Sequence, residues 1–373
     1  MATYQSSARL GVQGQRTLGA AHYCSDAHFA DERARIFRRS WICVGRESDV
    51  AEAGQFIVRE VGGESLIIVR DGGGQVRAHF NLCRHRGTQL CEAHAGRFGK
   101  SIQCPYHAWT YALDGALIGV PDQRDMADFS LEEHPLHQAA CATWEGFVFV
   151  NLAADAEPFA SAYAPLAGKW ARYQLRSLVR LGQADYDVHA NWKLIVQNYS
   201  ECYHCAPVHP GLVKLSPPTS GGNDLTEGPF LGGYMDVTEP GGSLTLSGRA
   251  CAPTVGSLAP ADLQRVHYYT LFPNVLLSLH HDYVMVHRLW PLAPARTRVE
   301  CEWLFHPETA HDPAWQPNDG IAFWDRTNKE DWHVSELTQR GVASVRYAPG
   351  PYSAREAMAA AFDREYLRVM AHA

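Results

Sequence analysis

Two short segments that each pair one cysteine with one histidine constrain this chain more than any other feature. Cys83 is followed by His85, Cys104 is followed by His107, and eighteen residues separate the two halves. Thiolates and imidazoles are the ligands of zinc and of mixed iron–sulfur clusters, in which one iron takes two Cys and the other takes two His. Zinc fingers usually keep Cys with Cys and His with His. The mixed halves therefore favour a [2Fe–2S] cluster, with structural zinc as the weaker alternative.

The composition is that of a mildly acidic globular protein. The chain has 373 residues, 46% of them hydrophobic, which is enough for two domains. A formal net charge of −7 argues against broad affinity for nucleic acid. No apolar run is long enough to span a bilayer, and the first residues do not read as a secretory signal. We therefore expect a cytoplasmic protein whose thiols stay reduced, with five cysteines as small core residues: Cys24, Cys43, Cys141, Cys251 and Cys301.

Turn and strand signals divide the chain into two regions with different predicted secondary structure. Short β-rich runs between residues 55 and 151, separated by Gly- and Asp-containing turns, predict a small all-β module. A helix capped by Ser25 and ending near Trp41 precedes that module. Beyond Pro158 the pattern predicts an α+β module with an antiparallel sheet and long helices. Its expected elements are a helix over 191–203, a loop or lid over 216–260, strands over 266–279, 283–291 and 298–306, and helices over 317–339 and 353–373.

A second cluster of metal-binding residue types lies in this second module. His204 and His209 are five residues apart, which on a continuous helix would point them about 140° apart. Pro207 is expected to break the helix between them, so that His209 can fold back. Two His and one carboxylate form the facial triad of non-haem Fe(II) oxygenases, which leaves positions open for O2 and substrate. A later helix offers three acids as the third ligand: Asp325, Glu330 and Asp331.

Residues next to His204 allow further interpretations. Cys202 and Cys205 could form a second zinc site or a redox pair, but thiolates beside an oxygen-activating iron would be oxidised, so we expect packing residues. Glu201 is either a solvated surface residue or a buried partner of a histidine ligand. The second role is favoured, because a buried carboxylate needs hydrogen bonds and ligating histidines need an acceptor on their free nitrogen.

Three segments carry a resemblance to a known family. Residues 81–87 read Asn-Leu-Cys-Arg-His-Arg-Gly, residues 104–109 read Cys-Pro-Tyr-His-Ala-Trp, and residues 144–151 read Trp-Glu-Gly-Phe-Val-Phe-Val-Asn. Together they resemble the Rieske ring-hydroxylating oxygenase α-subunits. The resemblance covers most of the chain and is weakest over 216–260. It implies the following ligands: Cys83 and Cys104 for the inner iron of the cluster, His85 and His107 for the outer iron, and His204, His209 and Asp331 for a mononuclear Fe(II).

The same resemblance implies an architecture. An N-terminal all-β Rieske [2Fe–2S] domain would precede a catalytic domain of the helix-grip, START-like type, with boundaries at 1–42 for an N-terminal helical segment packing on the catalytic domain, 43–155 and 156–373. Asp331 is preferred over Glu330 and Asp325, because in the family an acid lies just before an apolar or aromatic residue on this late helix. Glu201 would bridge the two metal sites of neighbouring subunits, and a head-to-tail contact that closes gives a ring, here a homotrimer.

The segments 201–204, 271–274, 303–307 and 328–332 look closest to the choline, carnitine and glycine-betaine monooxygenase branch. The resemblance implies a monooxygenase or dioxygenase component that uses O2 and reductase-supplied electrons to hydroxylate or N-demethylate a small quaternary ammonium compound. The sequence carries no dinucleotide-binding fingerprint, flavin motif or plant-type ferredoxin motif. We therefore expect a separate NAD(P)H-dependent flavin and iron–sulfur reductase as partner.

Two substrate classes compete in this prediction. A quaternary ammonium group would be held by an aromatic cage, for which the candidates are Tyr199, Tyr203, Tyr268, Tyr269, Phe272, Tyr283 and Trp324. An aromatic acid would instead need a cationic or hydrogen-bonding group, for which the candidates are Arg288, His280 and His281. A Rieske electron carrier and a zinc-binding scaffold are the non-enzyme alternatives, and the second metal site argues against both.

Overall fold

The computed structural model describes residues 3–12 and 14–372, and the chain divides into two compact units. One unit comprises residues 33–167, and the other combines residues 1–32 with 168–373. Residues 33–42 are grouped with the β-rich unit, where Arg38 Nε donates to the Gly62 carbonyl and Trp41 Nε1 donates to the Glu157 carbonyl. The last residue of the helix predicted over 353–373 lies outside the described residues. An all-β unit and an α+β unit confirm the predicted fold class.

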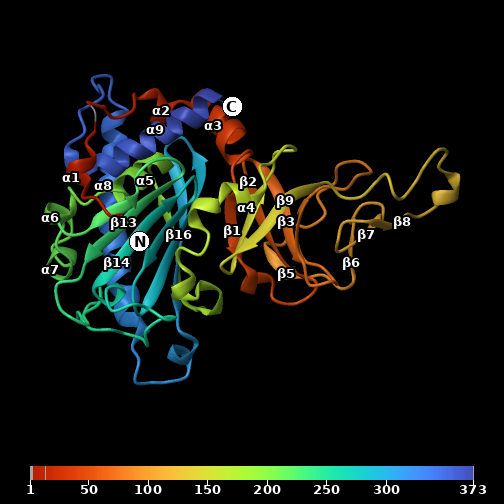
Figure 1. Ribbon diagram of the computed structural model, residues 1–373. Coiled ribbons are helices and arrows are strands. Elements are labelled where there is room, and N and C mark those ends of the chain that lie inside the picture. Colours follow the sequence, from red (N-terminus) through yellow and green to blue (C-terminus); the bar gives the residue numbers. More distant parts are fainter. Residues whose placement is uncertain (1–2, 13, 373) are drawn as a thin grey trace. The chain divides into compact units, whose positions relative to one another are not determined.

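The β-rich unit is built on an antiparallel sheet, drawn in red to yellow in Figure 1. Its strand order is β1-β10-β9-β4-β3-β2-β5, with β6-β7-β8 as a separate small sheet. Val69, Ile102, Tyr111 and other buried residues form its core. The strands are β1 (Ile42–Arg46), β2 (Gln55–Val61), β3 (Glu64–Arg70), β4 (Val76–Phe80), β5 (Ala95–Arg97), β6 (Ser101–Gln103), β7 (Thr110–Ala112), β8 (Leu117–Gly119), β9 (Gln138–Trp144) and β10 (Phe147–Asn151).

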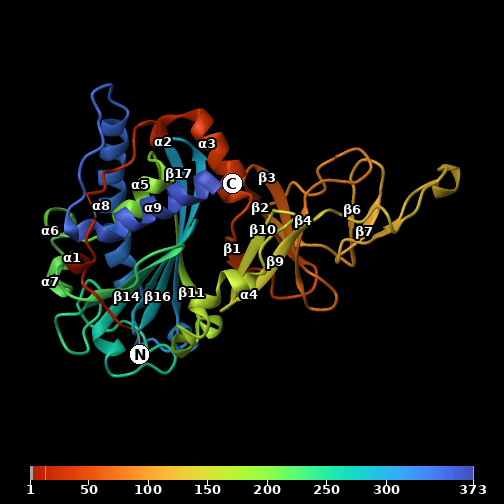
Figure 2. The same cartoon turned by 45° about the horizontal axis from the view of Figure 1, so that its top comes forward.

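The α+β unit is built on a second antiparallel sheet in the order β11-β17-β16-β15-β14-β13-β12. Its strands are β11 (Val179–Val188), β12 (Gly222–Leu225), β13 (Phe230–Asp236), β14 (Arg265–Leu271), β15 (Val275–Leu279), β16 (Tyr283–Ala293) and β17 (Arg296–Phe305). Figures 1 and 2 show its three long helices on one side of the sheet: α5 (Trp192–Tyr199), α8 (Pro317–Val342) and α9 (Ala357–His372). The shorter helices are α1 (Ser7–Leu10), α2 (Ala21–Cys24), α3 (Asp26–Glu32), α4 (Phe159–Ala162, in the β-rich unit), α6 (Cys205–Val208) and α7 (Leu212–Leu215).

Side-chain alternation along β16 explains which face of this sheet the helices cover. Tyr283 and Met285 join a core with Phe323 and Trp324 of α8. His287 continues the same face, and its Nε2 lies 3.2 Å from Asn328 Oδ1 on α8. Because successive side chains of a strand point to opposite faces, the intervening residues of β16 face away from the helices.

Several predicted elements differ from the structure. The helix predicted over 191–203 ends at Tyr199, and Pro207 lies inside the short helix α6 instead of breaking a longer one. The strand predicted over 266–279 is two strands joined by a turn at residues 272–274, and the loop expected over 216–260 contains β12 and β13. The strand β13 was missed because Gly232 and Gly233 interrupt its apolar pattern. Both glycines are required by the close approach of the strands, since an added Cβ at either would lie 2.0 Å from a backbone oxygen of a neighbouring strand.

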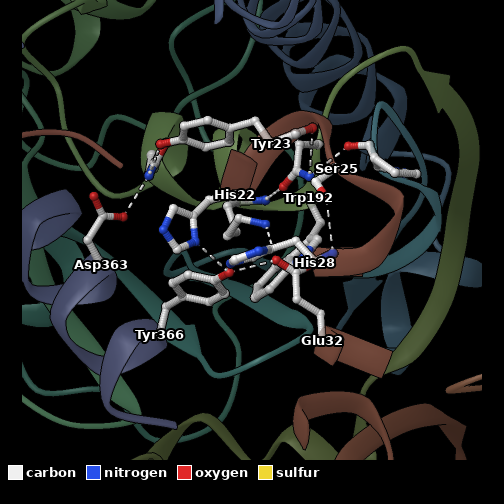
Figure 3. Close-up of polar contacts among 12 residues, drawn as sticks. His22, Tyr23, Ser25, His28, Glu32, Trp192, Asp363 and Tyr366 are labelled. Atoms are coloured by element: carbon white, nitrogen blue, oxygen red, sulfur yellow. Dashed lines mark hydrogen bonds and ion pairs between the residues drawn. The ribbon is translucent and has the colours of Figure 1, made fainter. Parts of the chain in front are cut away.

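The N-terminal segment is tied to the helices of its unit by a buried polar cluster, drawn in Figure 3. Glu32 pairs with the buried Lys193 of α5 and accepts from Trp192 Nε1 at 2.9 Å and from Tyr366 Oη at 2.9 Å. Ser25 acts as the predicted cap, since its Oγ accepts from the His28 amide at 3.3 Å, but the helical segment ends at Phe37 instead of near Trp41. The cluster fixes α5, whose C-terminal end leads into the histidine segment.

None of the helices among the described residues is both long and apolar enough to cross a bilayer. Of the five cysteines expected in the core, Cys43, Cys251 and Cys301 are buried. The expectation is wrong for Cys24, which is exposed at the end of α2, and holds only in part for Cys141, which is half-buried.

Candidate metal centres and the adjoining cavity

Two loops at one end of the β-rich unit bring the predicted cluster residues together. They repeat one hydrogen-bond pattern: the Cys83 amide donates to the Thr88 carbonyl at 2.8 Å, and the Cys104 amide donates to the Trp109 carbonyl at 2.8 Å. The residue four positions after each cysteine has a left-handed backbone, with φ 74° at Gly87 and 57° at Ala108. Such φ is uncommon for a residue other than Gly, so the second loop keeps the turn of the first despite its Cβ.

The four side chains form two layers that differ in exposure. Cys83 and Cys104 are buried and lie within hydrogen-bonding reach of each other, whereas His85 is exposed and His107 half-buried. The two imidazole rings lie 4.7 Å apart, and the His85 ring stacks on Trp109 at 4.9 Å. Thiolates inside and imidazoles outside are the donor set that a mixed two-iron cluster requires.

Tyr111 supports the inner layer in a way that the sequence did not indicate. Its hydroxyl accepts from the Arg84 amide at 3.0 Å and lies 3.2 Å from Cys83 Sγ. With its lone pairs turned to that amide, the hydroxyl proton is available to the sulfur. Burial raises the pKa of Cys83 and outweighs the hydrogen bond from Tyr111, which lowers this pKa and so favours the thiolate.

In the α+β unit, His204, His209 and Asp331 converge. One ligand atom from each can be chosen so that all lie within 4.8 Å of one another, a spread that a single ion can bridge. Asp331 Oδ1 lies 3.2 Å from His204 Nε2 and 2.8 Å from His209 Nε2. Neighbouring ligand atoms at bonds of about 2.1 Å and right angles are about 3 Å apart, so both spacings suit a six-coordinate cation. Two imidazoles and one carboxylate are the donor set of a facial triad.

The other nitrogen of each histidine faces a second acid. His204 Nδ1 donates to Glu201 Oε1 at 2.6 Å, and His209 Nδ1 donates to Glu330 Oε2 at 2.7 Å. A carboxylate on the far nitrogen fixes the ring orientation and the tautomer, and turns both Nε2 atoms to the same point. Of the three acids considered, Asp331 joins the triad, Glu330 holds His209 from outside, and Asp325 accepts from the Tyr186 hydroxyl at 2.9 Å.

The acids make this point favourable for positive charge. Burial disfavours the charged form of His204, but hydrogen bonds and charges from Asp331 and Glu201 outweigh that effect and raise its pKa to about 10. The balance also raises the pKa of His209, with burial again opposed by Asp331 and Glu330. Burial would raise the pKa of Asp331, but the two histidines lower it. A group of this kind binds a cation in place of protons.

The segment between the two histidines holds its shape through a turn and a covalent link. Glu201 Oε2 accepts from the amides of Tyr203 and His204, the latter at 3.2 Å, which ends the helix and starts the turn. Cys202 and Cys205 form a disulfide, so the expectation of two packing thiols is wrong. The Cys-x-x-Cys spacing indicated a possible disulfide. It was not predicted because all thiols of the chain were expected to stay reduced.

A cavity of about 310 Å³ adjoins the triad. Three of the seven aromatic candidates line it: Tyr199, Tyr268 and Trp324. Their rings are neighbours, with centroids 6.1 Å apart for Tyr199 and Tyr268 and 6.3 Å apart for Tyr268 and Trp324. Among the described residues that line the cavity, Tyr203, Tyr269, Phe272 and Tyr283 do not occur. Tyr199, Tyr268 and Trp324 therefore form an aromatic wall beside the triad.

The remaining walls come from segments that the sequence did not assign to a site. Residues 219–223 and 6–8 line the cavity with small and polar side chains, and residues 231–235 of β13 add Leu231, Tyr234 and Met235 beside two glycines. Glycine pairs at 221–222 and 232–233 were the available signal, because they let strands approach closely and leave room beside them.

The groups proposed for an aromatic acid are engaged elsewhere. Arg288 lies on the sheet face opposite the helices and pairs with Glu300 at 3.2 Å and Glu302 at 2.7 Å. His281 Nε2 lies 3.0 Å from the Gly242 carbonyl, and His280 stacks on Tyr283 at 4.1 Å. None of the three is among the described residues that line the cavity.

Both units match models of known protein families. Residues 40–133 match the model of the Rieske [2Fe-2S] domain, and residues 175–372 match the ring hydroxylating alpha subunit (catalytic domain). The second match covers more than half of the chain.

Individual relatives agree with these models. The glycine betaine monooxygenase oxygenase subunit of Chromohalobacter salexigens is 32% identical over 91% of this chain and 82% of its own. The carnitine monooxygenase oxygenase subunit of Escherichia coli is 36% identical over 52% of each chain. Among solved structures, the quaternary ammonium Rieske monooxygenase CntA in complex with L-carnitine is 25% identical over 97% of both chains, with a TM-score of 0.80.

These matches confirm several predictions at the level of the family. The cofactors are a Rieske [2Fe–2S] cluster and a mononuclear iron, and the protein works with a separate reductase and a small-molecule substrate. It is an enzyme, which removes the electron carrier and the zinc scaffold as alternatives. The chain belongs to the Rieske ring-hydroxylating oxygenase α-subunit family.

Proposed function

We propose that this chain oxidises a quaternary ammonium compound, by hydroxylation or N-demethylation, with O2 and electrons from a separate reductase. One observation carries the substrate class: the aromatic wall formed by Tyr199, Tyr268 and Trp324 lies on the cavity that adjoins the triad. Aromatic faces attract quaternary ammonium groups, and two relatives of this chain are named for glycine betaine and carnitine. Arg288, the cation first considered for an aromatic acid, is already paired with two buried acids and does not line the cavity.

In this proposal the chain holds its two cofactors at separate places. Cys83, Cys104, His85 and His107 hold the cluster, and His204, His209 and Asp331 hold the iron through Nε2, Nε2 and Oδ1. When bound, these groups supply one-electron transfer and the activation of O2. Glu201 and Glu330 keep the imidazoles oriented with their Nδ1 protons in place, and the aromatic wall positions the N-methyl groups and excludes water.

A single turnover tests this function without the native reductase. The iron-loaded protein is reduced with dithionite, freed of excess reductant and mixed with O2 and one compound from a panel of glycine betaine, carnitine, choline and benzoate. We expect an oxidised product, or formaldehyde from N-demethylation, with the ammonium compounds and none with benzoate. Oxidation of benzoate alone would replace the proposed substrate class by the aromatic acid.

We further propose a homotrimer in which Glu201 links the iron site of one subunit to the cluster of its neighbour. Glu201 Oε1 already accepts from His204 Nδ1, and the adjoining Tyr203 is 52% exposed, which leaves this turn at the surface. A carboxylate has about four lone-pair directions, so Glu201 can accept a further hydrogen bond from a cluster histidine of another subunit. A heterologous contact that closes gives cyclic symmetry.

Native mass spectrometry and a Glu201→Gln variant test the assembly. The wild-type protein should have the mass of three chains. Because Glu201 also orients His204, the variant is loaded with excess iron before the assay. It should keep its cluster spectrum but yield product more slowly after reduction, because the link between the two centres is weakened. A monomeric protein with full single-turnover yield would contradict the bridge.

A further inference from the structure

One arginine lines the cavity that adjoins the triad. Among the described residues that line it, Arg355 is the sole Lys or Arg, and the acids Glu201 and Asp331 are both engaged with His204. Arg355 lies in the turn just before α9, between the capping residue Ser353 and the helix start at Ala357. No motif around Arg355 indicated a place at the site.

The guanidinium group is held against the segment that carries the triad. Arg355 Nη2 donates to the Cys202 carbonyl at 3.2 Å and more weakly to the Pro218 carbonyl at 3.4 Å. Its Cζ lies 5.2 Å from the centre of the exposed Tyr203 ring. Cys202 is two residues before His204, so these contacts hold the charge beside the turn that carries the candidate iron site.

No acid neutralises this charge within the part of the chain that the structure describes. Both hydrogen bonds of Arg355 leave from Nη2 and end on neutral carbonyl oxygens. A guanidinium has five N–H donors, so the three on Nε and Nη1 have no acceptor among the described residues. Other arginines of this unit, such as Arg172 and Arg296, pair with a carboxylate at 2.8 Å. An unneutralised arginine beside a ligand cavity is suited to bind an anionic group of the ligand.

We propose that Arg355 binds the carboxylate of a zwitterionic substrate, which therefore carries a quaternary ammonium group at one end and a carboxylate at the other. This inference rests on the proposed function and narrows it. The ammonium group lies against the aromatic wall, and the carboxylate accepts hydrogen bonds from Nε and Nη1 of Arg355. A betaine satisfies both ends. A choline-type alcohol offers only the cation, which Arg355 repels, so Arg355 determines specificity within the ammonium class.

Binding to the iron-loaded protein tests this role independently of turnover. Isothermal titration calorimetry would compare glycine betaine and carnitine with their methyl esters, which keep the ammonium group and lose the negative charge, and with choline and benzoate. A hydrogen bond to a charged group changes affinity by about 10- to 100-fold. We expect the two acids to bind at least about 10-fold more tightly than their esters and than choline.

Variants assign the preference to this residue. Arg355→Gln should weaken the binding of the two acids by about 10- to 100-fold and leave the esters within about twofold. Arg355→Lys should restore part of the difference, because the charge is kept. Arg364→Gln is the matched control, since Arg364 lies on α9, donates to Gln15 at the surface and does not line the cavity. Should Arg355→Gln fail to fold, the acid and ester affinities of the wild-type protein and of Arg355→Lys still show whether Arg355 binds the carboxylate.

The outcomes separate this inference from the function on which it rests. Equal binding of acids and esters by the wild-type protein, or unchanged binding of the acids by Arg355→Gln, overturns the role of Arg355 and leaves the ammonium class standing. Tight binding of benzoate that depends on Arg355 overturns the zwitterion, because a carboxylate alone then suffices. Binding of none of the ammonium compounds overturns the proposed function itself.

Discussion

The two candidate metal centres of this chain are built in opposite ways. The cluster residues come from two loops, within 25 residues of each other, and no carboxylate hydrogen-bonds to the histidines among the described residues. The triad combines His204 and His209 with Asp331, more than 120 residues further along the chain, and both imidazoles face acids on both nitrogens. The contrast indicates that backbone turns shape the cluster site, whereas side-chain carboxylates shape the iron site.

The largest expected effect is the loss of turnover in a variant that removes one centre and leaves the other intact. His204→Ala should remove the mononuclear iron and lower turnover by at least about 100-fold, since even the outer partners of metal ligands are worth 10- to 100-fold. The visible spectrum of the cluster should remain, because none of its ligands is touched. His333→Ala is the control, an exposed histidine on α8 outside the triad. Turnover that survives in His204→Ala would show that the triad is assigned to the wrong residues.

A second variant tests whether carboxylates orient the iron ligands. Glu330→Gln keeps the size of the side chain but replaces the charged acceptor of the His209 Nδ1 proton. We expect iron affinity to fall by about 10- to 100-fold, measured by competition with a chelator, while the cluster content stays constant. Asp325→Asn on the same helix should leave iron affinity unchanged. Equal losses in both variants would indicate a general effect on α8.

The disulfide next to the triad should matter less than the acids. Replacing Cys202 and Cys205 together by Ser should lower the free energy of unfolding by no more than about 2 kcal/mol, because the loop that the bond closes is very short. Iron content should be unchanged, since Glu201 still holds the turn through the Tyr203 and His204 amides. Chemical denaturation and metal analysis measure both. Loss of iron in this double variant would assign the shape of the turn to the covalent link.

The smallest expected effect concerns the candidate cluster site, where, within the described part of the chain, a tyrosine hydroxyl and no carboxylate contacts a ligand. Tyr111→Phe removes the hydroxyl that lies 3.2 Å from Cys83 Sγ. This hydrogen bond is stronger when the cluster is reduced, because reduction makes the sulfur more negative. If it favours the reduced state by about 1 kcal/mol, losing it should shift the one-electron potential by about 40 mV toward more negative values. A redox titration followed by the visible spectrum gives the shift. An unchanged potential would mean that the hydroxyl does not donate to the sulfur.

The same contrast explains which parts of the two sites could be predicted from the sequence. The convergence of the two Cys–His loops was predictable because each half is a local motif, and local backbone geometry follows from neighbours in the chain. Asp331 could be chosen only by resemblance, since three acids share its helix and only the fold turns Asp331 inward and Glu330 to the far nitrogen of His209. The end of α5 was misplaced, because capture of amides by the Glu201 carboxylate, and not Pro207, stops the helix.

Long-range placement explains the remaining differences. β12 and β13 lack the alternation that marks a strand, because their glycines serve close approach of neighbouring backbones. Arg355 has no motif around it, and its place at the cavity follows only from how α9 meets the turn that carries Cys202. Residues of this kind become visible when the fold brings distant segments together.

Metal and sulfide analysis of the purified protein tests the central claim, that each chain holds two separate iron centres. A Rieske cluster and one mononuclear site predict about three iron atoms and about two acid-labile sulfides per chain, and His204→Ala should lower the iron count by about one without changing the sulfide. A wild-type protein that contains two iron atoms per chain, or zinc in place of iron, would contradict it.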